Sequence, residues 1–233
     1  MGHALSDSLL PLRQLRRTSR PKGRSFVLTG LLLVLAMPMA VAAIWLLNTT
    51  SISDLGAGNH LAESGLQARW AQGQVIVLIR HGERCDRSAH PCLAGADGIT
   101  VEGSHNALAV GSGLRRLGLD NARIIASPLT RTRQTGDFIS GTAVSTEGWV
   151  QQCTDDFKDA VLAHKRAHEN LVLITHSGCI DHFARQFDVR AGARGSDYTQ
   201  AFFVEDDGVN PPHILGALGA QQWGIVSAGQ GTR

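Results

Sequence analysis

Short apolar runs that alternate with helical segments constrain the fold of this chain more than any other feature. The runs Val75–Ile79, Ala122–Ala126 and Leu171–Thr175 are rich in aliphatic and β-branched residues, as in strands that are buried on both faces of a parallel sheet. Between the first two runs, Glu102–Leu117 has the apolar spacing of a helix. The alternation predicts an α/β fold, a three-layer sandwich whose mostly parallel sheet carries helices on both faces.

The same patterns place the remaining elements. One face of the helix at Glu102–Leu117 would carry the apolar side chains of Ala107, Val110, Leu114 and Leu117. Gly111 and Gly113 inside that helix indicate close packing against a neighbour. We expect further helices at Leu61–Trp70, Thr130–Ile139, Asp155–His168 and Ile180–Phe187, a loop at Cys85–Gly98, a short strand at Ala143–Ser145, and weaker strands at Ala201–Val204 and within His213–Val226.

The N-terminal part of the chain has the pattern of a membrane anchor. Residues 26–47 contain no charged residue and are numerous enough to cross a bilayer as a helix. Residues 1–25 hold six of the 22 basic residues and one of the 20 acidic ones, which predicts a cytoplasmic N-terminus. We therefore interpret 1–25 as a basic cytoplasmic segment, 26–47 as a transmembrane signal-anchor, 48–73 as a tether and 74–233 as an exported domain.

A cleaved signal peptide is the alternative interpretation of the apolar segment. Ala40-Val41-Ala42 resembles a cleavage site, although the apolar residues continue beyond it to Leu47. Both interpretations export the remainder of the chain. That remainder is mildly acidic, so nothing in it indicates a protein that binds nucleic acid.

The four cysteines agree with an exported domain, because disulfides form in oxidising compartments. Of the three possible connectivities we favour Cys85–Cys92 together with Cys153–Cys179. A metal site built from Cys85, His90 and Cys92 is an alternative, although the spacing matches no common zinc pattern. Simple buried thiols are the other alternative.

Polar residues follow each of the three main apolar runs. Arg80-His81 follows the first, Ser127 and then Arg131 follow the second, and His176 follows the third. The carboxyl ends of parallel strands meet at one edge of a sheet, where ligands bind. A guanidinium group matches the oxygens of a phosphate, and an imidazole can act as a nucleophile near neutral pH. The sequence therefore predicts phosphate chemistry at this edge.

Four segments, in this order, resemble the motifs of the histidine phosphatase superfamily, which has the phosphoglycerate-mutase-like fold. They are Arg80–Glu83, Ile99–Ala107, Ser127–Thr135 and Thr175–Gly178. Within that superfamily the sequence most resembles the lipopolysaccharide core heptose(II)-phosphate phosphatase group. This closer resemblance rests on His81–Ser88, Cys92-Leu93, Gly98–Thr100, Gln152-Cys153 and Cys179.

The resemblance implies an exported phosphoric monoester hydrolase that removes phosphate from a heptose of the lipopolysaccharide core through a phosphohistidine. His81 would be the nucleophile, and Arg80, Arg131 and His176 would surround the phosphate. Arg84 is a further candidate for phosphate binding, with a solvent-exposed or salt-bridged arginine as the alternative. The mechanism requires no metal or other cofactor. The enzyme would reside in the periplasm, anchored in the inner membrane through residues 26–47 or released after cleavage.

The sequence departs from the superfamily at the residue that protonates the leaving group. Many members have a glutamate where this chain has Gln152, and an amide cannot donate a catalytic proton as a carboxylic acid can. Asn106 and Ser177 are milder departures, from glutamine and glycine respectively. The possible substitutes for the missing acid are Glu83, Glu147, Asp155 and Asp156.

Two other functions are compatible with these residues. One is a phosphatase that acts on other sugar phosphates or small phosphoesters. The other is a catalytically silent protein that binds phosphate or glycans, which Gln152 favours and the complete set of Arg80, His81, Arg131 and His176 opposes.

Overall fold

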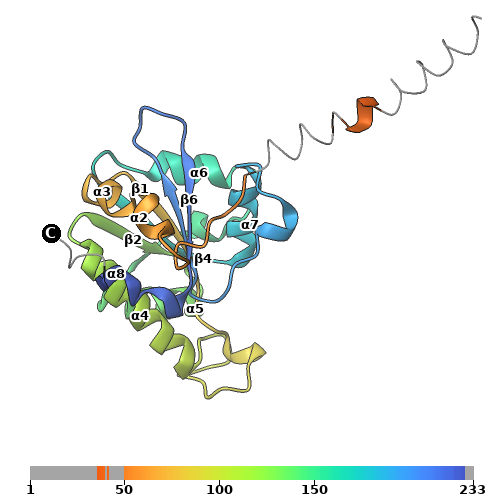
Figure 1. Ribbon diagram of the computed structural model, residues 1–233. Helices are drawn as coiled ribbons and strands as arrows, with labels where there is room; N and C mark the ends of the chain where they lie inside the picture. Colours follow the sequence, from red (N-terminus) through yellow and green to blue (C-terminus); the bar gives the residue numbers. More distant parts are fainter. Residues whose placement is uncertain (1–35, 40, 42–49, 229–233) are drawn as a thin grey trace, which may run out of the picture. The chain divides into compact units, whose positions relative to one another are not determined.

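The computed structural model describes residues 36–39, 41 and 50–228. It divides the chain into two compact units, Met1–Asn48 and Thr49–Arg233. All strands and helices discussed below belong to the second unit (Figure 1).

The expected cytoplasmic segment at 1–25 lies outside the described residues, and the expected transmembrane segment at 26–47 lies largely outside them. Among the helices that the structure does describe, none is both long and apolar enough to cross a membrane. The membrane anchor therefore stays a prediction.

A mixed six-stranded sheet forms the centre of the second unit, in the order β3-β2-β4-β1-β5-β6. Strands β1 to β4 pair in parallel, whereas β5 runs antiparallel to both β1 and β6. The predicted α/β class is confirmed, with an antiparallel strand beside the central β1. The strands are β1 Val75–Arg80, β2 Ala122–Ala126, β3 Ser145–Thr146, β4 Asn170–Thr175, β5 Ala201–Glu205 and β6 His213–Leu218.

Helices cover both faces of the sheet and enclose two apolar cores (Figure 1). The alternating side chains of β1 enter both, with Val77 and Ile79 in one core and Ile76 and Leu78 in the other. The first core is covered by α3 (Leu66–Ala71), α4 (Val101–Leu117), α5 (Thr130–Ser140) and α8 (Ile225–Ala228), and the second by α6 (Phe157–His164) and α7 (Ser177–Arg185). This arrangement is the expected three-layer sandwich.

The predicted elements differ from the observed ones mainly at their ends. The helix expected at Leu61–Trp70 is two short helices, α2 (His60–Glu63) and α3, because Gly65 between them has a positive φ of 62°. Weaker strands were expected within His213–Val226, and the strand observed there, β6, ends at Leu218. The chain there forms the 3₁₀ helix η4 (Ala220–Gln222) and then α8, because Trp223 and Val226 pack into the first core.

The segment that was expected to be a tether packs on the domain. The compact unit begins at Thr49, and Leu55, Leu66 and Trp70 are fully or almost fully buried. The backbone of Leu55 also donates a hydrogen bond to the Ala217 carbonyl oxygen at 2.9 Å. Residues 50–73 therefore close one side of the first core.

The two glycines inside α4 allow close packing, as the sequence predicts. A Cβ atom at Gly111 would overlap the carbonyl oxygen of Ile139 in α5, and one at Gly113 would overlap the ring of Trp223. The predicted apolar face is confirmed, because Ala107, Val110 and Leu114 are fully buried. The Gly111 contact sets the distance between α4 and α5.

We expect Gly111→Ala to lower the free energy of unfolding by about 1–3 kcal/mol, because α5 must shift to admit the methyl group. This loss opposes the gain of roughly 1 kcal/mol that alanine normally gives inside a helix. Urea unfolding measures the difference. The matched control is Gly192→Ala, where a Cβ atom would meet nothing within 4 Å; equal stability of the two variants would contradict the packing argument.

Candidate active site

The carboxyl ends of three neighbouring strands bring the predicted residues together. Arg80 pairs in register with Thr175 across β1 and β4, and Ala126 of β2 pairs with Ile174 of β4. His81 and His176, which follow these strands, have ring centroids 5.4 Å apart. The two predicted histidines therefore share one site.

His81 is a buried imidazole whose tautomer is fixed by the backbone. Only 4% of the residue is exposed, and its Nδ1 lies 2.8 Å from the carbonyl oxygen of Gly82. A carbonyl oxygen only accepts hydrogen bonds, so Nδ1 carries the proton and the Nε2 lone pair is free in the neutral ring. Burial is the main cause that lowers the pKa of His81 to about 3; the Gly82 bond opposes the shift, while His176, Arg131 and Arg80 add to it.

A chain of hydroxyl groups orients the second histidine. The Thr132 hydroxyl donates to the backbone carbonyl of Ser127 at 2.8 Å or of Leu129 at 2.7 Å. Its oxygen therefore accepts the Ser127 hydroxyl at 2.7 Å. Because the Ser127 hydroxyl proton is donated to Thr132, the Ser127 oxygen accepts a hydrogen bond from Nε2 of His176 at 2.9 Å. Burial, followed by the charges of Arg131 and Arg84, lowers the pKa of His176 to about 4.

Arg80 and Arg131 both keep an unpaired donor. In each, Nε is buried and has no hydrogen-bond partner. Buried donors are normally satisfied, so the pair indicates a site for an anion. Arg80 is held in place from two sides: one guanidinium nitrogen donates to the Ser196 carbonyl oxygen, and the guanidinium carbon lies 3.9 Å from the centroid of the Tyr198 ring.

Arg84 is salt-bridged in this structure. Its Nε donates to the carboxylate of Asp86 at 2.7 Å, and a second nitrogen contacts the other carboxylate oxygen. Its charge nevertheless contributes to the low pKa of both His176 and Arg131. Arg84 therefore lies at the border of the site, in the salt-bridged state that the sequence offered as the alternative.

Among the four acidic candidates, Glu83 is held in its ionised form. Its carboxylate accepts hydrogen bonds from Thr100 at 2.8 Å and from His90 at 2.7 Å. Burial raises the pKa of Glu83, but hydrogen bonds from His90, Thr100 and Ser88 outweigh burial and lower it overall. An ionised carboxylate has no proton to give to a leaving group.

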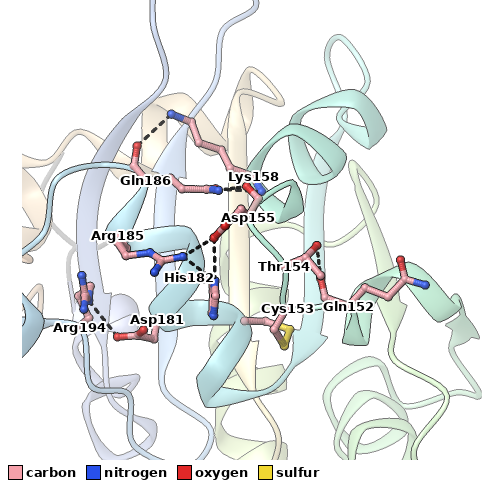
Figure 2. Close-up of polar contacts among 11 residues, drawn as sticks. Gln152, Cys153, Thr154, Asp155, Lys158, Asp181, His182, Arg185, Gln186 and Arg194 are labelled. Carbon is pink, nitrogen blue, oxygen red and sulfur yellow. Dashed lines mark hydrogen bonds and ion pairs between the residues drawn. A yellow bond between two sulfur atoms is a disulfide. The ribbon is translucent and has the colours of Figure 1, made fainter.

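The other three acidic candidates lie on the segment between β3 and α6. Glu147 accepts from the Trp149 indole, and Asp155 pairs with Arg185 and His182 of α7. Figure 2 shows Asp155 directed toward these two residues, while the Gln152 side chain extends away from them. Asp156 is exposed at the start of α6. Within residues 50–228, none of the four carboxylates forms a hydrogen bond or ion pair with the two site histidines, Arg80 or Arg131.

Both predicted disulfides are present, Cys85–Cys92 and Cys153–Cys179. The alternative of buried thiols was wrong, because all four cysteines form disulfides. The alternative of a metal site was also wrong, because Cys85 and Cys92 are joined in a disulfide and His90 is hydrogen-bonded to Glu83. The first disulfide braces the loop after the Arg80-His81 motif. The second attaches the segment containing Gln152 to the first turn of α7, which begins directly after His176.

Tyr198 is a site residue that the sequence did not single out. Its ring centroid lies 5.7 Å from that of His81, in addition to its contact with Arg80. It precedes β5, whose antiparallel pairing with β1 was not predicted. No local sequence pattern signals this contact, because it depends on how β5 adds to the sheet.

Comparisons with known proteins agree with this site. Residues 76–151 match the histidine phosphatase superfamily (branch 1). The lipopolysaccharide core heptose(II)-phosphate phosphatase of Salmonella newport (strain SL254) is 33% identical over 135 residues, 55% of this chain and 67% of that protein. The protein of the same name from Escherichia coli O9:H4 (strain HS) is 32% identical over 164 residues, 66% of this chain and 80% of that protein.

A solved structure resembles the fold as well. Phosphoserine phosphatase of Entamoeba histolytica, in complex with 3-phosphoglyceric acid, has a TM-score of 0.47 and 14% identity over 64% of this chain and 98% of its own. The family match and the sequence relatives define this chain as a phosphoric monoester hydrolase. It belongs to the histidine phosphatase superfamily.

We expect both site imidazoles to stay neutral from about pH 5 to pH 8, because their pKa values are lowered to about 3 and about 4. NMR titration of the ring protons tests this expectation. Unfolded imidazoles bind protons near pH 6.5, so between that pH and about 3 the unfolded state binds more protons. Stability is then lost as the pH falls through this window. A titration midpoint near 6.5 for either ring would contradict the burial argument.

Proposed function

We propose that this protein is an exported phosphatase that removes phosphate from a heptose of the lipopolysaccharide core, through a phosphohistidine on His81. The observation that carries the proposal is a neutral, buried His81 with a free Nε2, beside two arginines that each keep an unpaired buried Nε. A nucleophile with a free lone pair and a cationic site for the phosphate oxygens are the two parts that phosphoryl transfer requires.

The reaction takes place in two steps. Nε2 of His81 attacks phosphorus, a P–N bond forms, and the bond from phosphorus to the sugar oxygen breaks. The sugar leaves with the bonding electrons and takes up a proton from water to become an alcohol. Water then attacks the phosphohistidine, the P–N bond breaks, and inorganic phosphate and neutral His81 are restored. Arg80 and Arg131 stabilise the charge on the equatorial oxygens in both steps.

The backbone contacts of His81 serve the first step in particular. Attack from Nε2 places positive charge on the ring, and the Gly82 carbonyl oxygen, 2.8 Å from Nδ1, stabilises that charge. The backbone nitrogen of His81 also donates to Thr175 at 3.0 Å, which ties the nucleophile to the strand that carries His176. The imidazole is thus positioned before substrate binds.

The choice of substrate rests on the relatives. Two of them, 32% and 33% identical, are named lipopolysaccharide core heptose(II)-phosphate phosphatases. The same names favour an enzyme over the silent binding protein. Export rests on the apolar run at 26–47 and on the two disulfides, which form readily outside the reducing cytoplasm. Localisation in the periplasm would bring the site close to lipopolysaccharide.

We expect His81→Ala to lower phosphate release at least about a thousandfold, because the nucleophile is lost. The assay uses the full chain with phosphorylated lipopolysaccharide core and, separately, with an aryl phosphate. Brief reaction followed by denaturation should trap an acid-labile phosphoprotein in the wild type alone. The matched control is His213→Ala, an exposed histidine at the start of β6. Undiminished turnover by His81→Ala would refute the mechanism, and release from the aryl phosphate alone would refute the substrate.

Export predicts that all four cysteines are oxidised in cells. We expect a thiol-specific alkylating reagent, added to acid-quenched cells, to modify no cysteine of the full chain until a reductant is supplied. The control is the chain expressed in the cytoplasm without residues 1–47, whose cysteines should be alkylated at once. Rapid alkylation of the full chain would contradict export.

A further inference from the structure

A cavity of about 510 Å³ lies beside the phosphate site, within the range of about 300–1,000 Å³ that is typical of small-molecule sites. Tyr198 and Ser196 connect the two. Both line the cavity, and both contact Arg80, Ser196 through its carbonyl oxygen and Tyr198 through its ring. Since Tyr198 also faces His81, the cavity adjoins the phosphate site at these two residues.

The cavity presents uncharged hydrogen-bonding groups from separate parts of the chain. The amide nitrogen of Gln221 donates to the amide oxygen of Asn106 at 2.7 Å. This bond leaves the Asn106 nitrogen and the Gln221 oxygen without a partner among the described residues. The Ser196 hydroxyl is buried and also has no partner. Such a mixture of donors and acceptors complements sugar hydroxyl groups, which donate and accept at once.

The charges of the cavity differ from those of the phosphate site. Its lining contains the acidic residues Asp54 and Asp197, but no lysine, arginine or histidine. Asp54 is already engaged by Gln222, at 2.9 Å and 3.2 Å. A second anionic group on the substrate would meet like charges and no cation there, whereas a neutral group would meet hydrogen-bonding groups and apolar side chains such as Ile180 and Phe202.

We propose that this cavity binds the leaving group of the phosphate ester and that it selects a neutral, polyhydroxylated sugar. The inference rests on the proposed function and adds a specificity site to it. Asn106, Gln221 and Ser196 bind the hydroxyl groups, Tyr198 packs beside the ester where the sugar meets the phosphate, and Asp197 disfavours esters that carry a further anionic group at this position.

The test compares three substrates of the full chain: glucose 6-phosphate, 3-phosphoglycerate and p-nitrophenyl phosphate. We expect kcat/KM for the sugar phosphate to exceed that for 3-phosphoglycerate at least about tenfold, because the carboxylate of the latter finds no cation in the cavity. Gln221→Ala should lower kcat/KM for glucose 6-phosphate about two- to tenfold, mainly through KM, and should lower it less for the aryl phosphate. Gln221→Lys should raise kcat/KM for 3-phosphoglycerate, since it supplies the missing cation.

The control is Gln67→Ala, an exposed glutamine on α3 outside the cavity. Two results would overturn this inference: an equal loss of kcat/KM with all three substrates in Gln221→Ala, or a wild-type preference for 3-phosphoglycerate. If His81-dependent release from p-nitrophenyl phosphate persists, the proposed function stands and only this inference fails. Absence of that aryl phosphate activity would instead contradict the proposed function, and the inference with it.

Discussion

A neutral imidazole held next to two guanidinium groups is the constraint on which the site depends. In water, an imidazole beside cations would still take up protons in mild acid, but burial at the end of the central strand makes the charged ring of His81 unfavourable. Strands β4 and β5 flank β1 and exclude water from this position. The same enclosure strengthens the interaction of Arg80 and Arg131 with a bound anion, since charges interact more strongly in a medium of low dielectric constant. One feature of the packing therefore serves both the proposed nucleophile and the proposed phosphate-binding arginines.

The loop after His81 is organised before any substrate arrives. The backbone of Cys85 donates to Gly98, and that of Thr100 donates to Glu83, at 3.1 Å and 2.9 Å. The Glu83 carboxylate also accepts hydrogen bonds from the side chains of His90 and Thr100. The Cys85–Cys92 disulfide closes the same loop. The Glu83 carboxylate thus holds this loop in place. A loop that is already ordered loses little entropy when a ligand binds.

The parts of the fold that could be predicted are those that local pattern encodes. Apolar runs specify β1, β2 and β4, and because parallel strands end at one edge, Arg80, His81, Arg131 and His176 could be placed together from the sequence. The contribution of Tyr198 could not be predicted from the sequence, because it depends on the antiparallel pairing of β5 with β1, which no local pattern signals. The hydrogen-bonded hydroxyl groups that link Thr132 through Ser127 to His176 could not be predicted either. They depend on how the ends of β2 and β4 are aligned in the sheet. Residues 50–73 look like a linker by composition, and only their burial reveals that they belong to the core.

The contact between Arg80 and Ser196 spans 116 residues of sequence. Contacts of such separation form late, because the intervening chain must first be ordered. During synthesis both histidines and both arginines leave the ribosome before the Ser196–Tyr198 segment does, so a nascent chain carries every motif of the site while Arg80 still lacks its support. The phosphate site is therefore completed from its C-terminal end. A chain truncated before Ser196 would retain the sequence signature of the superfamily but would lack the support of Arg80. The signature alone does not distinguish such a chain from one with the complete site.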